Sequence, residues 1–198
     1  MKFRVSIVFV FFISCLWPGI SFAQNKVVVV PLNSNNVAGS TSYIWISGNG
    51  VRPYHQSDST IINMMNNGGA KIYRGSAPGN KNVMLPITIS GPFLGYPVTV
   101  TGLDIYWKGE TEFDIISAIL MRRQTAVNES TGWESLLADH TARTCNTQPD
   151  GCTIHYDLSS NNTLSATSGI LYITIELGFS GETTEIQIGG ARLEIMHE

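Results

Sequence analysis

The spacing of apolar residues in residues 97–107 is the feature that most constrains the fold. The apolar positions are Val98, Val100, Leu103, Ile105 and Trp107. They alternate with other residues, which is the pattern of a β-strand with one buried face. The alternation changes phase at Gly102, as it does when a β-bulge inserts one extra residue and flips the side chains that follow. We therefore predict a long, bent, central strand.

Shorter segments of the same kind recur along the chain, separated by turns rich in Gly, Asn, Asp, Ser and Pro. We predict strands at residues 42–47, 70–74, 83–89, 115–123, 133–144, 153–158, 169–177 and 186–196. The last strand repeats the phase change at Gly189 and Gly190, so we expect two bulged strands at equivalent places in two packed sheets. The pattern predicts an all-β fold, an antiparallel two-sheet sandwich of jelly-roll-like type, with an immunoglobulin-like topology as the alternative.

Residues 51–69 fit two structures. Ser57 and Asp58 are suited to cap a short helix that would end at Gly68. The same residues are also compatible with loop and strand. We favour the extended form because the surrounding segments are all β.

The N-terminus has the pattern of a secretory signal peptide, residues 1–23. Lys2 and Arg4 precede an apolar run, and Ala23 ends a small-residue cleavage motif. The run is shorter than the roughly 20 apolar residues that a membrane span needs, and no later stretch reaches that length, so we predict no membrane span. We expect a secreted or periplasmic protein cleaved after Ala23. The alternative is a lipoprotein anchored at Cys15.

Two regions follow the expected cleavage site. Residues 24–39 begin with the four-valine run 27–30, which suits an edge strand or an extended segment that adds to a partner. Residues 40–198 are expected to form a single β-sandwich domain. The net charge of the whole chain is −3, and Lys2 and Arg4 leave with the signal peptide. Without a basic face, nucleic-acid binding has no electrostatic basis.

Cys145 and Cys152 are the cysteines that remain after Cys15 is removed. The turn signature Pro149-Asp150-Gly151 lies between them and lets the chain double back. We predict a disulfide that stabilises the exported domain by roughly 2.5 kcal/mol in the chain-entropy model. A redox or metal pair is the alternative, but the sequence has neither a Cys-x-x-Cys motif nor a histidine cluster at ligand spacing.

Several segments together resemble an uncharacterised group of secreted bacterial β-sandwich proteins. They are Ile46-Ser47-Gly48, Arg52-Pro53, Gly68 to Tyr73, Val83 to Pro86, Val98 to Tyr106 and Ile188 to Leu193. The start Lys26 to Leu32 also looks like the segments that follow signal peptides in exported bacterial proteins. The resemblance covers most of residues 44–195 and implies the fold and export. It implies no catalytic or ligand-binding residue.

Catalytic patterns are scarce in this sequence. It has no Gly-x-Ser-x-Gly motif, and the candidate cluster of His, Asp and Ser is His55, Asp58 and Ser59. Residues so close on one loop are typical of a turn, because catalytic triads assemble from distant segments. We therefore expect a protein that is not an enzyme, with no catalytic residues.

Acidic residues alternate in the loop after the central strand, at Glu110, Glu112 and Asp114. Calcium binds six to eight oxygen atoms, and such a loop would supply some of them. The alternative is a solvated hairpin tip whose charges discourage edge-to-edge association. We favour the hairpin tip and expect no cofactor, with calcium as the alternative.

Aromatic residues are the stronger lead to function. Sandwich-fold carbohydrate-binding modules stack Trp and Tyr on sugar rings, which is an analogy at the level of the fold. The candidates for ligand binding here are Trp107, Tyr106, Tyr54, Tyr96 and Trp133. The alternative is that Trp45, Trp107 and Trp133 fill the core while the tyrosines cover its rim.

Three functions are therefore considered. The first is a non-enzymatic surface or glycan-binding module. The second is a structural or assembly subunit that donates residues 27–30 as a strand to a neighbour. The third is a secreted hydrolase. The expected partner is an extracellular glycan or another cell-surface component, and the sequence indicates no oligomeric state.

Overall fold

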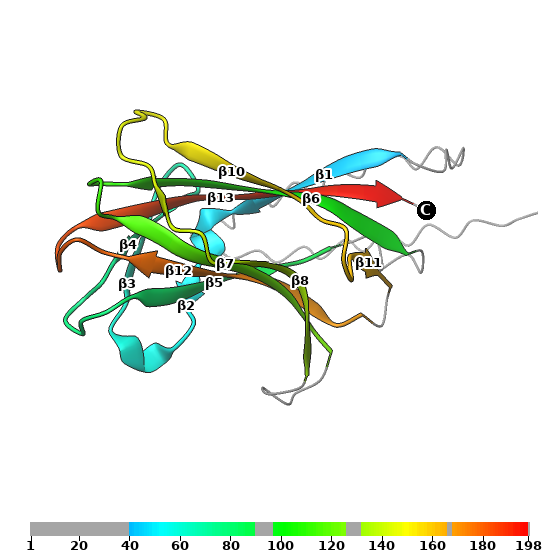
Figure 1. The fold of residues 1–198 in the computed structure, drawn as a ribbon, viewed down its shortest axis with the longest axis horizontal. Coiled ribbons are helices and arrows are strands. Elements are labelled where there is room, and N and C mark those ends of the chain that lie inside the picture. Colours follow the sequence, from blue (N-terminus) through cyan, green and yellow to red (C-terminus); the bar gives the residue numbers. More distant parts are fainter. Residues whose placement is uncertain (1–39, 90–96, 126–131, 166–167, 198) are drawn as a thin grey trace, which may run out of the picture. The chain divides into compact units, whose positions relative to one another are not determined.

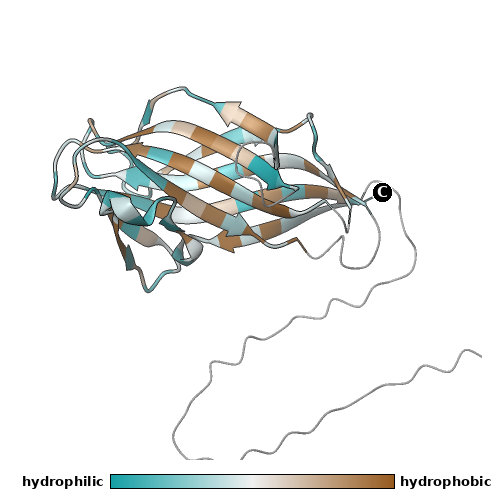
Figure 2. Ribbon diagram, turned by 90° about the horizontal axis from the view of Figure 1, so that it is seen from below, coloured by the Kyte–Doolittle hydropathy of each residue, from teal (hydrophilic) through white to brown (hydrophobic). Residues whose placement is uncertain are grey.

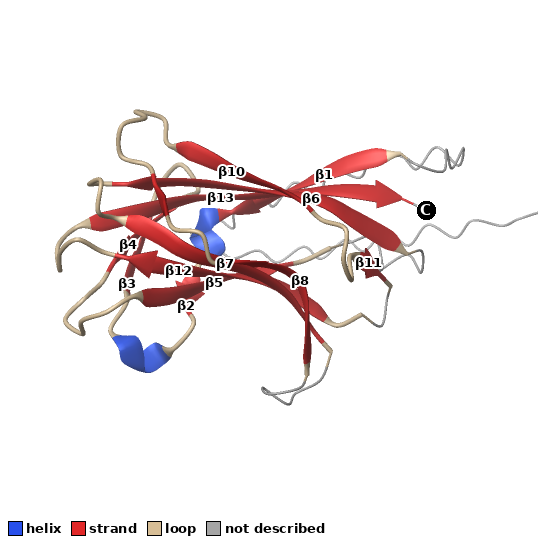
Figure 3. Ribbon diagram, viewed as in Figure 1, coloured by secondary structure: helices blue, strands red, loops and turns tan. Residues whose placement is uncertain are grey.

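Two antiparallel β-sheets face each other in this protein (Figures 1 and 3). The computed structural model describes residues 40–89, 97–125, 132–165 and 168–197. They belong to one unit, Asn36–Glu198. The helical segments in the described ranges are two 3-10 turns, η1 (Gly48–Gly50) and η2 (Gln56–Asp58). Within these ranges, no helix is long and apolar enough to cross a membrane.

Sheet A has seven strands: β1 (Thr41–Ser47), β3 (Ile61–Met64), β4 (Ala70–Tyr73), β6 (Val98–Gly109), β10 (Cys152–Asp157), β11 (Thr163–Leu164) and β13 (Glu185–His197). Sheet B has six: β2 (Arg52–Pro53), β5 (Lys81–Ile87), β7 (Ile115–Gln124), β8 (Trp133–Asp139), β9 (Arg143–Thr144) and β12 (Ile170–Gly178).

The strand order identifies the topology. Sheet A runs β10-β6-β13-β4-β3, with β1 also beside β13, and sheet B runs β2-β5-β12-β7-β8. The chain alternates between the sheets from β4 to β7 and again from β11 to β13. This is the arrangement of a jelly roll. The predicted jelly-roll-like sandwich is therefore confirmed, and the immunoglobulin-like alternative is wrong.

The core lies between the two sheets and is filled by one face of each strand. On β12 the buried face carries Leu171, Ile173, Ile175 and Leu177, as the alternation predicts. β6 contributes Leu103, Ile105 and Trp107 to the same core. Figure 2 shows hydrophobic and hydrophilic residues alternating along the strands. Period-two patterning therefore decides which side chains remain on the outer faces.

Both predicted bulges are present, but their placement differs from the prediction. Glu194 pairs with Gly102 and the next residue pairs with Val100, so β6 carries one extra residue there. Ile188 and Gly190 pair with consecutive residues of β6, so Gly189 is the extra residue of β13. The two bulged strands are hydrogen-bonded neighbours in sheet A. The expectation that they lie in separate sheets was wrong, because a phase change carries no information about the pairing partner.

Residues 51–69 form loop and two short strands, so the extended form that we favoured is present in part. Residues 52–53 and 61–64 form strands β2 and β3, and η2 is a single short turn between them. β3 pairs with β4 in sheet A, so tertiary pairing determines its conformation. The alternative of a helix ending at Gly68 is wrong.

The predicted disulfide joins Cys145 and Cys152, whose Cα atoms are 5.9 Å apart. Cys145 follows β9 in sheet B, and Cys152 begins β10 in sheet A. The bond therefore ties an edge of one sheet to an edge of the other. Tyr156 of β10 reinforces the same side of the sandwich, since its hydroxyl donates to Asp139 of β8 at 2.6 Å.

Candidate functional site

The outer face of sheet A carries a group of exposed aromatic rings. On β1, Ile44 and Ile46 pack against the core, which places Tyr43 and Trp45 on the outer face. Trp45 is 65% exposed and Tyr43 is 53% exposed. On β6, the burial of Ile105 and Trp107 likewise directs Tyr106 outward. We call Tyr43, Trp45 and Tyr106 the aromatic cluster.

Strand register aligns the aromatic cluster with charged residues. Trp45 of β1 lies opposite Arg192 of β13, Arg192 lies opposite Asp104 of β6, and Asp104 lies opposite His155 of β10. Directly opposed residues in antiparallel strands have their side chains in contact range on the same face. One row across four strands therefore brings these four side chains together.

The rings of the aromatic cluster are held by each other and by a cation. Trp45 and Tyr106 lie nearly parallel, with ring centroids 5.5 Å apart and planes at 20°. The guanidinium carbon of Arg192 lies 5.0 Å from the Tyr43 ring centroid and 5.5 Å from that of Trp45, within the range of a cation–π interaction. Gly189 lies beside Tyr106 and has no side chain. A Cβ at Gly189 would contact the Tyr106 Cβ at 3.4 Å.

Asp104 anchors the polar part of this row. Its side chain is buried, Arg192 Nε donates to Oδ2 at 2.7 Å, and His155 Nδ1 lies 2.7 Å from Oδ1. Burial raises the pKa of Asp104, but the hydrogen bonds from His155 and Arg192 outweigh it and hold that pKa below its ordinary value. The hydrogen bond to Asp104 raises the pKa of His155. The carboxylate thus fixes both cationic partners, one of which holds the rings.

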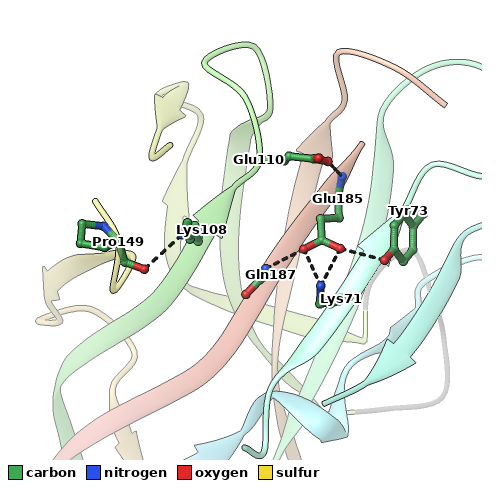
Figure 4. A network of polar contacts seen from close by, with 7 residues as sticks. All are labelled: Lys71, Tyr73, Lys108, Glu110, Pro149, Glu185 and Gln187. Atoms are coloured by element: carbon green, nitrogen blue, oxygen red, sulfur yellow. Dashed lines mark hydrogen bonds and ion pairs between the residues drawn. The ribbon is translucent and has the colours of Figure 1, made fainter. Parts of the chain in front are cut away.

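A second group of polar residues lies on the same face beyond the Gly189 bulge, and all of its members are drawn in Figure 4. We call Lys71, Tyr73, Lys108, Glu110, Glu185 and Gln187 the polar cluster. Lys71, Gln187 and Lys108 form one row across β4, β13 and β6. Tyr73 and Glu185 lie opposite each other in the next row.

Glu185 is the centre of the polar cluster. Its carboxylate accepts hydrogen bonds from Lys71 Nζ at 2.8 Å, from the Tyr73 hydroxyl at 2.8 Å and from Gln187 Nε2 at 2.6 Å (Figure 4). Burial raises the pKa of Glu185, but these three hydrogen bonds outweigh it and lower that pKa below its ordinary value. Glu110 accepts from the Glu185 backbone N–H at 3.0 Å. Contacts within the sheet therefore hold Lys71, Tyr73 and Gln187 around Glu185.

Two clefts adjoin this face. One has a volume of about 580 Å³ and lies beside Tyr73, at the end of the polar cluster. Its lining is Ser59, Ile61, Tyr73, Gly75, Ser76, Glu182 and Thr183. The other has a volume of about 450 Å³ and lies beside His155. The rest of its lining is Trp107, Arg143, Thr144, Cys152, Thr153 and Ile154.

The predicted ligand-binding aromatics do not gather in one place. Of the five, only Tyr106 belongs to the aromatic cluster. Trp107 is 3% exposed and packs in the core, where it borders the cleft beside His155. Trp133 lies on sheet B, with the Arg122 guanidinium 4.1 Å from its ring centroid. Tyr54 makes an edge contact with His55, and Tyr96 lies outside the described residues.

Sequence reasoning missed Trp45, which it assigned to the core as one alternative. It also missed Tyr43, Asp104, His155 and Arg192 as members of a site. The signal for Trp45 was available, because Ile44 and Ile46 alternate with it. Residue type suggested the core, whereas the period of the strand determined the outcome.

The acidic residues of the loop after β6 do not converge on one point. Asp114 is fully buried and accepts hydrogen bonds from Thr111 N at 2.8 Å, Ser180 N at 2.8 Å and Thr184 Oγ1 at 2.9 Å. Its oxygens are therefore already used to join two loops. Within the described part of the chain, no group of three or more His, Cys, Asp or Glu is placed to hold a metal ion.

The loop with His55 and Asp58 has the geometry of a turn. Asp58 Oδ1 accepts hydrogen bonds from the backbone N–H of Thr60, at 3.0 Å, and from the hydroxyl of the same residue. Elsewhere, Ser42 Oγ lies 2.7 Å from His197 Nε2. Over the ranges that the structure describes, no carboxylate contacts His197, so this pair lacks the orienting group of a triad.

Comparison with known proteins adds little to this picture. No protein-family model matches the chain, and no curated protein matches it. Among solved structures it is similar to a xylan-binding module, CBM15, with 10% identity and a TM-score of 0.47 over 78% of this chain and 97% of that one. It is also similar to a structure described as "CBM4 structure and function", with 14% identity and a TM-score of 0.44 over 76% and 96%. Likenesses this distant carry no conclusion about function.

Proposed function

We propose that this protein is a non-enzymatic glycan-binding module and that its binding face is the outer surface of sheet A. The observation that carries the proposal is the aromatic cluster. The C–H face of a pyranose ring is apolar and stacks on aromatic side chains, while sugar hydroxyls bind polar groups at the rim. Trp45 and Tyr43 are more than half exposed on a strand, with Arg192, Asp104 and His155 beside them.

The rigidity of the aromatic cluster supports the same role. Tyr106 and Arg192 both contact the Trp45 ring, and Asp104 fixes Arg192 in turn. Side chains that are already ordered lose less conformational freedom when a ligand binds. Burying the exposed face of an indole against a sugar then gains about 25 cal/mol per Å² of apolar surface removed from water.

The polar side chains of this face favour binding over catalysis. Asp104 is committed to Arg192 and His155, and the remaining ring nitrogen of His155 lies 3.3 Å from Asp157. A hydrolase acting through His155 needs a hydroxyl or a water-activating carboxylate within hydrogen-bond reach of a free nitrogen. These contacts occupy His155 with carboxylates instead.

Export is part of the proposal. It rests on the signal-peptide pattern of residues 1–23 and on the Cys145–Cys152 disulfide, a bond typical of oxidising compartments. Expression of the full chain in a bacterial host followed by N-terminal sequencing of the exported protein tests it. A mature chain that begins at Gln24 is expected, whereas retention of the uncleaved chain in the cytoplasm would contradict it.

Binding is tested by affinity electrophoresis in gels containing arabinoxylan, glucomannan, mixed-linkage β-glucan or hydroxyethylcellulose. Retardation in at least one gel is expected. Trp45→Ala should weaken that binding by about tenfold or more, since a central aromatic anchor contributes ~1.4 kcal/mol or more. Trp133→Ala is the matched control, because Trp133 is an exposed tryptophan on sheet B.

Two results would refute the proposal. One is the absence of retardation by all four polysaccharides and of binding on a glycan array. The other is an equal loss of binding in Trp45→Ala and Trp133→Ala. Circular dichroism and thermal unfolding of each variant establish that the sandwich is intact, so that lost binding is not lost folding.

A further inference from the structure

We infer that the ligand is a neutral polysaccharide chain that lies lengthwise along β6 and β13, across the aromatic cluster and the polar cluster together. This inference rests on the proposed function and adds the class of ligand and the direction in which it binds. It is drawn from the position of the two clusters, the cleft at the far end and the charges of the face.

The bulge in β13 places the two clusters on one face. Gln187 precedes Gly189 and Arg192 follows Gly190, and these residues have opposite parity in the sequence. In an uninterrupted strand they would point to opposite faces. With Gly189 as the extra residue, Lys108 pairs with Gln187 and Asp104 pairs with Arg192, and all four side chains lie on the outer side of the sheet.

The two clusters together cover a length that exceeds one sugar. Asp104 lies on β6 and Glu110 directly follows the last residue of that strand, six residues further on, which is about 20 Å at the rise of an antiparallel strand. That length is several times the length of a pyranose ring. A monosaccharide or disaccharide bound on Trp45 would therefore leave the polar cluster without a role, whereas an oligosaccharide of several units reaches both.

The far end of the polar cluster opens into the cleft of about 580 Å³. Tyr73 belongs to both, since it donates to Glu185 on the face and lines the cleft. Ser59, Ser76 and Thr183 supply hydroxyl groups to the cleft. Hydroxyls and backbone groups are suited to bind sugar hydroxyls, so a chain that passes Glu185 meets further polar partners there.

The charges of the face favour a neutral chain. Its cationic side chains each have a partner already. Arg192 and His155 bind Asp104, Lys71 binds Glu185, and Lys108 donates to the Pro149 carbonyl oxygen at 3.1 Å. Carboxylates outnumber these cations on the described part of the face, where the acidic side chains are Asp104, Glu110, Asp157, Glu185 and Glu194. A uronic acid polymer would meet net repulsion.

Isothermal titration with paired oligosaccharides tests this inference on the wild-type protein. The probes are cellobiose and cellohexaose, xylobiose and xylohexaose, and mannobiose and mannohexaose, with hexameric polygalacturonate as the acidic probe. We expect the hexamer of at least one neutral series to bind tenfold or more tightly than its dimer. We expect the acidic hexamer to bind more weakly than that neutral hexamer.

Variants of the polar cluster test the direction of the chain. Gln187→Ala and Lys71→Ala should each weaken hexamer binding about fivefold, the loss of roughly one hydrogen bond, and leave dimer binding unchanged. Asn82→Ala, on β5 of sheet B, is the matched control. Because Lys71 also binds Glu185, thermal unfolding of its variant is measured alongside, and Gln187→Ala gives the independent reading.

The outcomes separate this inference from the proposed function. Equal affinity for dimer and hexamer, with binding still lost in Trp45→Ala, overturns the inference and leaves glycan binding standing. Tighter binding of polygalacturonate than of every neutral hexamer also overturns it, as does hexamer binding that is insensitive to both polar-cluster variants. Absence of binding by every probe overturns the inference and the proposed function together.

Discussion

Arg192 of β13 donates from Nε to Oδ2 of Asp104 on β6 at 2.7 Å, and the same guanidinium lies against Tyr43 and Trp45. A buried carboxylate therefore orders an exposed aromatic surface through one cation. Burying a carboxylate is costly unless it is paired and hydrogen-bonded, and Asp104 satisfies that condition with Arg192 and His155. The stability of the sandwich and the geometry of its outer face depend on the same carboxylate.

Asp104→Asn should lower the free energy of unfolding by about 2 kcal/mol, because it weakens two charge-assisted hydrogen bonds at a buried position. It should also weaken glycan binding by releasing Arg192. Asp157→Asn is the control, since the Asp157 side chain is 97% exposed, and a change within about 0.5 kcal/mol is expected. Urea unfolding measures both. Equal stability of the two variants would contradict the anchoring role of Asp104.

The Asp104–His155 contact should make the free energy of unfolding depend on pH in two ranges, one acidic and one near neutral or above. The folded-state pKa of Asp104 lies below its ordinary 3.8, so its contribution is present above about pH 4 and is lost as pH falls through the lowered pKa. The pKa of His155 is raised above 6.5, so its contribution is complete below that pH and is lost as pH rises through the raised pKa. The contact should therefore stabilise most between about pH 4 and pH 6.5.

Thermal unfolding of the wild type and of His155→Gln at pH 5.5 and pH 8.5 measures this effect. The wild type should exceed the variant by up to ~1 kcal/mol at pH 5.5 and by less at pH 8.5, a small effect because the His155 side chain is 56% exposed. A difference that grows from pH 5.5 to pH 8.5 would show that protonated His155 does not stabilise the fold.

Gly190 should tolerate no side chain. Its φ is +140°, and a Cβ there would lie 2.2 Å from the backbone oxygen of Ile46 on β1. Gly190→Ala should therefore cost about 2–4 kcal/mol by straining the backbone and separating β1 from β13. Gly189→Ala is the control, because its Cβ meets Tyr106 at 3.4 Å, an ordinary contact. Similar melting temperatures for the two variants would contradict this account.

Asp114→Asn should destabilise the protein by about 2–4 kcal/mol, since the buried carboxylate joins the loop after β6 to Ser180 and Thr184. Glu112→Gln, at an exposed position of the same loop, should be neutral. With Asp114 so engaged, addition of calcium or of EDTA should leave the melting temperature unchanged. A rise of several degrees with calcium would reveal a site that these hydrogen bonds do not account for.

Local patterning predicted the strands because each buried face needs an apolar residue at every second position. Residues 97–107 and 169–177 follow that rule, and β6 and β12 occupy them. The glycine bulges were predictable for the same reason, since a phase change needs one extra residue. The short strand β3, which follows η2, was less evident from the sequence. Its pairing with β4, rather than its own residue pattern, determines its conformation.

The candidate site was not predictable as a group because it depends on strand pairing. Asp104 and Arg192 are 88 residues apart in the sequence, and His155 and Asp104 are 51 apart. A single sequence indicates which side of its own strand each residue occupies, but not which strand lies beside it. Trp45 could have been placed correctly, because the flanking isoleucines already assign the inner side of β1.

Deleting Gly189 would exchange inside and outside along the last eight described residues of β13. Arg192 and Glu194 would be driven toward the apolar interior, and Leu193 and Ile195 would turn to water. The apolar residues of β13 stand at even positions before Gly189 and at odd positions after Gly190. The extra glycine keeps both sets on the inner face. A lineage that lost this one residue would lose the continuous outer face before it lost the β-strand.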